Sequence, residues 1–230
     1  MTEIIMRHSM AASSPKSLSS LLAAVTLAEE ISRDVSARQS LIAPRPLGAA
    51  LKRQSWQEHS HVAIFRAARQ CLPRKASCPP PLQRALQGYS ARLHADIDRN
   101  DLAGSIVGLQ CVLEGLGAVA LQPPPGALAA FAERCLPVRS FILHQELGHQ
   151  RLGEVWLPRL DATPARLLSA ARAYTELAQA VLQAGLATLD CLAADAGHYE
   201  QAVRAHLKST ELLVGRDEET ALAAFVPTGN

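Results

Sequence analysis

The sequence has few aromatic residues and little net charge, and each shortage excludes a class of protein. Aromatic residues make up 4% of the 230 residues, and no stretch alternates apolar and polar residues as half-buried strands do. The formal net charge is +2, and the basic residues are scattered rather than gathered in a stripe. A β-rich fold and a nucleic-acid partner are therefore disfavoured. A glycine-rich phosphate loop and a GxSxG nucleophile motif are also missing.

Cysteine is present in an odd number, and no two cysteines form a CxxC pair. This pattern argues against a disulfide framework and against a zinc knuckle. Reduced thiols in a cytoplasmic protein are the simpler expectation, and the N-terminal residues MTEIIMRHSMAASSPKS lack the long apolar core of a secretion signal. The five residues concerned are Cys71, Cys78, Cys111, Cys135 and Cys191.

Apolar residues, in contrast, make up 48% of the chain, and alanine and leucine dominate them. This composition favours helices packed on helices, and the length fits one domain with a full core. We expect an all-α domain over 17–215, a disordered lead-in over 1–16 and a polar tail over 216–230. Proline and capping residues divide the domain into predicted helices at 17–39, 47–71, 82–97, 102–121, 127–135, 138–157, 165–195 and 197–214.

The segment 102–122 is almost entirely apolar and contains one charged residue, Glu114. Its length raises the question of a membrane span, but a carboxylate at the centre of a span is costly. We therefore expect no membrane span and assign this segment to the protein core. A carboxylate buried there must be protonated, paired or bound to a metal ion.

Two Glu-x-x-His pairs supply possible partners for that carboxylate: Glu58 with His61, and Glu146 with His149. Residues three apart share one face of a helix, so each pair can offer an oxygen and a nitrogen to the same point. The thirteen glutamates and eight histidines of the chain make one such pair easy to reach by chance. The occurrence of two pairs is therefore suggestive rather than decisive.

The order of these residues repeats along the chain. Glu29 precedes the first pair by 29 residues, and Glu114 precedes the second pair by 32. Two helices that each give a glutamate and two that each give Glu-x-x-His form the di-iron or di-manganese site of four-helix bundles. Two divalent ions nearly balance the four carboxylates, and a ligand set rich in oxygen and without thiolate favours iron, with manganese possible, over zinc.

The run ELGHQRLGEVWL, which begins at Glu146, resembles the last metal-binding helix of the cyanobacterial aldehyde-deformylating oxygenases. The ligand spacing and the chain length are also similar, although this chain has fewer tyrosines. The resemblance implies a ferritin-like four-helix bundle with additional helices. It places metal ligands at Glu29 or Glu30 and at Glu58, His61, Glu114, Glu146 and His149. We favour Glu29 because it continues the apolar stripe of Leu18, Leu21, Leu22 and Val25.

These features predict a di-iron oxygenase or oxidase that activates O2 at a carboxylate-bridged metal pair. Glu58 and Glu146 are expected to bridge the two ions, and Glu29 and Glu114 to be terminal ligands. The resemblance implies an apolar substrate such as a fatty aldehyde and a ferredoxin-like electron donor. Two alternatives stay open: a ferritin-like iron-binding ferroxidase, and a metal-free helical interaction protein in which the pattern is accidental.

Several neighbouring residues allow two interpretations. His59 and His144 flank the ligand positions and are either supports for the ligands or surface residues. Trp56 and Trp156 are expected to pack in the core. Glycines inside the predicted helices indicate either close helix contact or space beside the metals, and they are Gly108, Gly115, Gly117 and Gly148.

Overall fold

A computed structural model describes residues 15–122, 136–193 and 195–215, and these residues contain helices and no strand. The predicted all-α class is confirmed. The longer helices are α2 (Pro15–Ile42), α3 (Arg45–Gln70), α4 (Pro80–Asp98), α8 (Leu136–Trp156), α9 (Pro164–Thr188) and α11 (Ala196–Val214). The shorter segments are α5 (Leu102–Ile106), the π-helix η1 (Val107–Leu113), α6 (Glu114–Leu121), the 3-10 turn η2 (Leu157–Arg159) and α10 (Asp190–Ala193).

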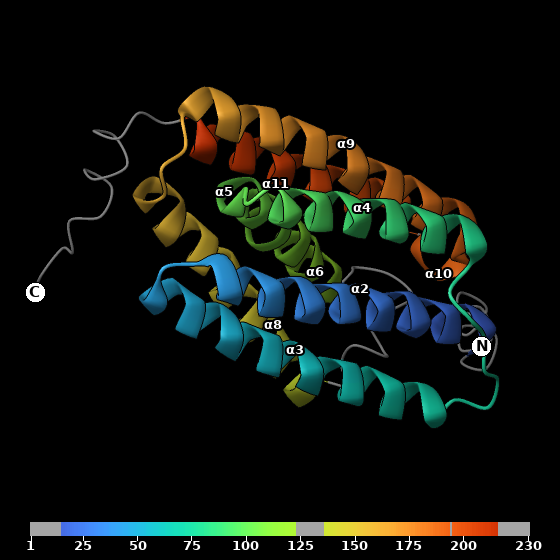
Figure 1. Cartoon of the computed structure of the whole chain (residues 1–230). Coiled ribbons are helices and arrows are strands. Elements are labelled where there is room, and N and C mark those ends of the chain that lie inside the picture. Colours follow the sequence, from blue (N-terminus) through green and yellow to red (C-terminus); the bar gives the residue numbers. More distant parts are fainter. Residues whose placement is uncertain (1–14, 123–135, 194, 216–230) are drawn as a thin grey trace, which may run out of the picture.

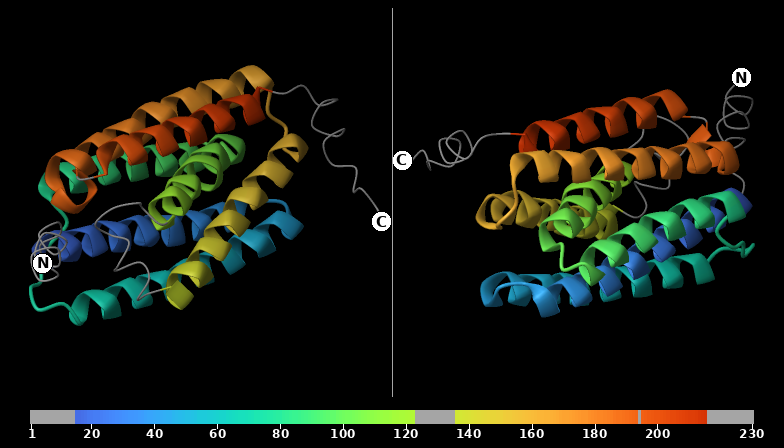
Figure 2. Two further views of the ribbon diagram at one scale, coloured as in Figure 1. Left: turned by 180° about the vertical axis from the view of Figure 1, so that it is seen from behind. Right: turned by 45° about the horizontal axis from the view of Figure 1, so that its top comes forward.

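The helices form two layers around a central segment (Figure 1). On one side, α2 and α3 form a long hairpin and lie side by side. On the other side, α4 and α11 pack against α9. The segment α5–η1–α6 runs between these layers, and α8 crosses next to it, where it contacts both η1 and α3 (Figure 2). Helices α2, α3, α6 and α8 thus converge on one interior region.

The central segment is the core of the bundle. Leu102–Leu121 has a mean hydropathy of 1.6 over its most apolar window, and 83% of that window is buried inside the protein. Among the described helices it is the one that is long and apolar enough to cross a membrane, and its burial matches the expected core position. Asp101 begins it as an N-cap, because its side chain accepts a 2.8 Å hydrogen bond from the Gly104 amide.

The central segment is not one regular helix, contrary to the prediction for 102–121. All seven residues of η1 are buried, and its wide turns lead directly to Glu114, whose backbone N–H donates to the Leu109 carbonyl five residues earlier. A π-helical turn inserts an extra residue into a helix, and such turns are frequent at functional sites. The periodicity of the apolar residues could not reveal it, because every position in this segment is apolar or buried.

Two glycines let neighbouring helices approach the central segment closely. A Cβ atom on Gly108 would lie 2.3 Å from the Tyr174 ring of α9, and one on Gly115 would lie 1.9 Å from the His206 ring of α11. His206 in turn donates a 3.3 Å hydrogen bond to the Val112 carbonyl. Close helix contact therefore explains these two glycines.

Some sequence-based expectations were wrong. The predicted helix 165–195 ends at Thr188, where Leu189 takes an extended conformation before the short α10. Trp56 is 69% exposed rather than buried, whereas Trp156 packs against the core as expected. The first helix is longer than predicted at both ends. The predicted helix 127–135 and nearly all of the lead-in and tail lie outside the described residues.

Candidate metal centre

Four helices bring the six predicted site residues together inside the bundle. Helix α2 supplies Glu29, α3 supplies a Glu-x-x-His pair, α6 begins with Glu114, and α8 supplies the second pair. All six side chains are buried. Their exposed fractions are 8% for Glu29, 0% for Glu58 and His61, 2% for Glu114, 3% for Glu146 and 4% for His149.

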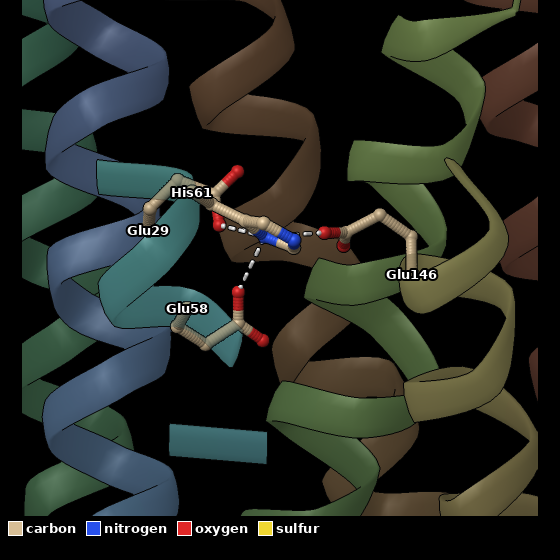
Figure 3. Close-up of side chains that lie close together, drawn as sticks. All are labelled: Glu29, Glu58, His61 and Glu146. Atoms are coloured by element: carbon tan, nitrogen blue, oxygen red, sulfur yellow. Dashed lines mark hydrogen bonds and ion pairs between the residues drawn. The ribbon is translucent and has the colours of Figure 1, made fainter. Parts of the chain in front are cut away.

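His61 lies among three carboxylates from three helices (Figure 3). Its Nδ1 atom is 2.9 Å from Glu58 Oε2, 3.2 Å from Glu29 Oε2 and 3.3 Å from Glu146 Oε1. These oxygens surround one point from three directions (Figure 3). That arrangement is suited to a cation that shares the imidazole nitrogen and the carboxylate oxygens.

His149 occupies a corresponding position on the other side of Glu58. Its Nδ1 atom is 2.9 Å from Glu58 Oε1 and 3.4 Å from Glu114 Oε2. The two oxygens of Glu58 therefore face the two different histidines. The ring centroids of His61 and His149 are 6.4 Å apart, so the two Glu-x-x-His pairs meet, as the hypothesis of a metal pair requires.

The potential ligand atoms fall into two groups, each with all its atoms within 4.8 Å of one another. One group holds Glu29, Glu58, His61 and Glu146, and the other holds Glu58, Glu114, Glu146 and His149. Glu58 and Glu146 belong to both groups. Two adjacent ions that share these two carboxylates would fit this arrangement.

The structure separates the two candidates of the first helix. Glu29 points toward His61 (Figure 3). The neighbouring Glu30 forms an ion pair with Arg66 instead, and its side chain is 30% exposed. Glu29 is thus the residue that lies at the candidate site, on the face that continues the apolar stripe of α2.

Burial and repulsion between like charges dominate the electrostatics of the carboxylates. Burial raises the pKa of Glu29 to about 8, and the hydrogen bond from His61 acts in the opposite direction. Burial and the neighbouring charge of Glu114 raise the pKa of Glu146 well above its ordinary value. Glu58 differs: burial acts to raise its pKa, but hydrogen bonds from the two histidines outweigh burial and lower it.

The histidines show the opposite trend. Burial acts to lower the pKa of His149, but hydrogen bonds to Glu114 and Glu58 raise it to about 9. The pKa of His61 is also raised, since its hydrogen bonds to surrounding carboxylates, Glu146 first, outweigh burial. Without metal, the cluster therefore retains protons that a bound cation would displace.

Three observations test whether a metal pair fits these residues. Glu58 Oε2 and Glu146 Oε1 are buried and both face Nδ1 of His61, at 2.9 and 3.3 Å, so a cation that displaces the proton of this nitrogen can bind all three atoms. A Cβ atom on Gly117 would lie 2.9 Å from Glu146 Oε2, so this glycine leaves room for the carboxylate. The donor atoms are oxygen and imidazole nitrogen, which suit iron and manganese. The residues present fit such a pair.

A chain of buried glutamines, which the sequence pattern did not predict, lies behind the carboxylates. Gln54 donates to Glu114 Oε1 at 2.9 Å and to Glu58 Oε1 at 3.3 Å. Its own carbonyl accepts a 3.0 Å hydrogen bond from Gln110 in the π-helix, and Gln110 pairs with Gln39 of α2. Gln110 in the strongly apolar segment 102–122 could have indicated it, because a buried amide needs hydrogen-bond partners.

A cavity of about 320 Å³ adjoins the cluster. Its described lining is mainly leucine, valine, isoleucine and alanine from α2, α3, α4, α6, α8, α9 and α11. Glu29, Glu114 and Glu146 also line it, so the carboxylates meet an apolar space. An apolar small molecule is the kind of ligand that such a cavity accommodates.

The remaining histidines near the motifs are not part of the cluster. His59 and His144 are both exposed, in agreement with the surface interpretation. Gly148, inside the second Glu-x-x-His, has open space around it rather than a close helix contact. The glycine that gives space to the candidate site is Gly117.

No protein-family model and no curated protein sequence matches this chain. Among solved structures, the chain is similar to a protein with aldehyde deformylating oxidase activity from Synechococcus. The two are 18% identical, with a TM-score of 0.74, and the match covers 94% of this chain and 96% of the other. At this identity the likeness shows the fold, and the predicted ferritin-like helical bundle is confirmed.

Proposed function

We propose that this chain is a di-iron oxygenase or oxidase that acts on an apolar substrate. The observation that carries the proposal is the pair of overlapping ligand groups that open onto an apolar cavity. The similar Synechococcus protein has aldehyde deformylating oxidase activity, which supports a fatty aldehyde as the substrate class. When bound in the reduced state, two iron ions would supply the electrons that activate O2.

The positions of the side chains support the proposed role of each residue. Glu58 and Glu146 belong to both ligand groups and are assigned as the bridging carboxylates. Glu29 and Glu114 are assigned as terminal ligands, one for each ion. His61 and His149 each give one imidazole nitrogen. The leucine-rich wall of the cavity excludes water and would orient the apolar part of a substrate toward these residues.

The cavity and the buried charges favour the oxygenase over a ferroxidase and over a metal-free interaction protein. A ferroxidase that only stores or oxidises iron has no need for an apolar space of about 320 Å³ beside its carboxylates. A metal-free interaction protein would not need six buried, ionisable side chains at one point, because burying them is costly. The four described cysteines are free, which supports a cytoplasmic location where a ferredoxin-like protein would donate electrons.

Elemental analysis of the purified protein tests the proposal. We expect about two equivalents of iron in the parent and a sharp loss of iron in Glu114→Ala. Glu30→Ala is the matched control, because Glu30 lies outside the cluster and pairs with Arg66, and it should retain the iron. A long-chain aldehyde is then supplied with O2 and a reducing system, and its consumption is measured. An iron-free parent, or one that consumes no apolar substrate, would contradict the proposal.

A further inference from the structure

Each histidine of the candidate site is held from behind by a glutamine of the opposite helix. His61 Nε2 on α3 lies 2.7 Å from Gln145 Oε1 on α8, and His149 Nε2 on α8 lies 2.9 Å from Gln57 Oε1 on α3. The contact is therefore reciprocal. In the sequence, each glutamine directly precedes the glutamate of its own motif, so both helices carry Gln-Glu-x-x-His.

The geometry determines which nitrogen of each ring carries a proton. A glutamine carbonyl oxygen accepts a hydrogen bond, so Nε2 of each histidine carries the proton and donates it. When the ring gives up its second proton, as metal binding requires, Nδ1 is the nitrogen left with a lone pair, and Nδ1 is the atom that faces the carboxylates. A metal ion binds only an unprotonated nitrogen, so this arrangement prepares both rings for a metal.

We propose that Gln57 and Gln145 are positioning residues that fix the tautomer and the orientation of the two metal-binding histidines. This inference rests on the proposed metal pair. The amide is neutral, whereas a carboxylate in the same place would add negative charge next to four buried glutamates. The glutamines thus hold the rings without disturbing the charge balance between the glutamates and two divalent ions.

Titration of the protein with ferrous iron under anaerobic conditions tests this role. Gln57→Leu and Gln145→Leu remove the acceptor, and each should weaken iron binding by about 10- to 100-fold. Gln150→Leu is the control, because Gln150 lies on the same helix α8 but bonds to Glu154 rather than to a histidine. The control should bind iron as the parent does.

Glutamate variants separate positioning from simple structural support. Gln57→Glu and Gln145→Glu keep an acceptor oxygen, so iron binding should recover relative to the leucine variants. The added negative charge stabilises the oxidised ions, so the midpoint potential of the bound iron should shift downward. Circular dichroism verifies that each variant is folded.

Two results would overturn this assignment. Leucine variants that are folded and bind iron as tightly as the parent would remove the positioning role alone. Glutamate variants with the affinity of the leucine variants and an unchanged potential would do the same. A parent that binds no iron would overturn the proposed function as well, so the two failures are distinguishable.

A different observation concerns a charged residue in the lining of the apolar cavity. Among the described residues that line this cavity, Arg139 is the one cation, and its Nε atom is buried without a hydrogen-bond partner. Arg139 lies seven residues before Glu146 on α8, a separation of about 10 Å along the helix axis. The cavity thus has carboxylates at one place and an unpaired guanidinium nitrogen at another.

We infer that the cavity binds an apolar chain that ends in a carboxylate, as a fatty acid does. A guanidinium group forms its strongest hydrogen bonds with a carboxylate, and the leucine-rich wall fits an alkyl chain. This goes beyond the proposed function: the ligand is an acid, held by its carboxylate at Arg139 with its alkyl chain in the apolar part of the cavity. The inference rests on the cavity and does not require bound metal.

Calorimetric titration of the full chain with a fatty acid and with the primary alcohol of the same length tests it. The parent should bind the acid at least about tenfold more tightly than the alcohol, as expected for one charge-assisted hydrogen bond. Arg139→Gln should lose this preference and bind the alcohol unchanged. Arg69→Gln is the matched control: its Nε also lacks a partner, but it does not line the cavity.

The measurement is repeated after removal of metal by a chelator. A preference that persists without metal and depends on Arg139 supports the subsite. A preference that disappears with the metal means that the acid binds the ions instead, and this overturns the inference. Equal binding of acid and alcohol by the parent, or binding of neither, overturns it too.

Discussion

Replacing Glu29 by glutamine should change stability in opposite directions with and without metal. In the metal-free protein the pKa of Glu29 is raised by burial from 4.5 to about 8, and its side chain is only 10% exposed. Between these two pH values the folded chain holds a proton that the unfolded chain has released. Stability therefore falls as the pH rises, by about 1.4 kcal/mol per pH unit.

At pH 7 this linkage costs the metal-free parent about 3 kcal/mol. An amide does not ionise, and its carbonyl oxygen can still accept a hydrogen bond from His61. Glu29→Gln should therefore raise the free energy of unfolding by up to about 3 kcal/mol at pH 7. Below about pH 3.5 the gain should vanish, because Glu29 is then protonated in both the folded and the unfolded chain.

Chemical denaturation of chelator-treated protein at several pH values measures this difference. Glu30→Gln is the control, since Glu30 is partly exposed and pairs with Arg66, and it should change stability by less than about 1 kcal/mol. With iron at about 1,000 times its dissociation constant the order should reverse, because bound ligand at that concentration stabilises the parent by about 4.1 kcal/mol, more than the gain of the variant. A metal-free variant less stable than the parent at pH 7, or a gap independent of pH, would refute the reasoning.

Three further predictions concern the metal site and the cavity. Gly117→Ala should weaken iron binding, because the new Cβ would lie 2.9 Å from Glu146 Oε2. Gly148→Ala is the control, because its new Cβ meets open space. This control should bind iron as the parent does and stabilise its helix by up to about 1 kcal/mol. Val25→Trp should fill part of the cavity and lower aldehyde consumption while iron content stays unchanged, as measured by elemental analysis beside an activity assay. Binding of ferrous iron to metal-free protein should release protons, detectable with a pH indicator in weak buffer, because the pKa of both His149 and Glu29 exceeds 7.

The helical fold could be predicted because composition, proline positions and helix caps all indicate it. Alanine and leucine dominate, proline marks the starts of α3, α4 and α9, and the N-caps Asp101 and Thr163 precede the helices predicted at 102–121 and 165–195. Helix ends were less accurate, since packing rather than local propensity decides how far a helix continues. The break at Leu189 had no proline or glycine to signal it.

The cluster could be predicted because burying a lone carboxylate is so unfavourable. Glu114 in an apolar helix demanded a partner, and the two Glu-x-x-His pairs were the available ones. The sequence pattern could not predict the hydrogen bonds that hold the two histidines from behind. Gln57 and Gln145 stand next to the motif glutamates in the sequence, but their bonds cross from one helix to the other, and only the packing of α3 on α8 reveals them.

The π-helix belongs both to the core of the fold and to the contacts that support the carboxylates. Gln110 lies in it, and Gln54 joins Gln110 to the carboxylates of Glu58 and Glu114. Gln110 and Glu114 are four residues apart and both bond to Gln54 of α3, so they lie on one side of the central segment. Deleting one of the three residues between them, Cys111–Leu113, should turn Gln110 about 100° away from Glu114. We expect this deletion to lose iron binding while the outer helices stay folded.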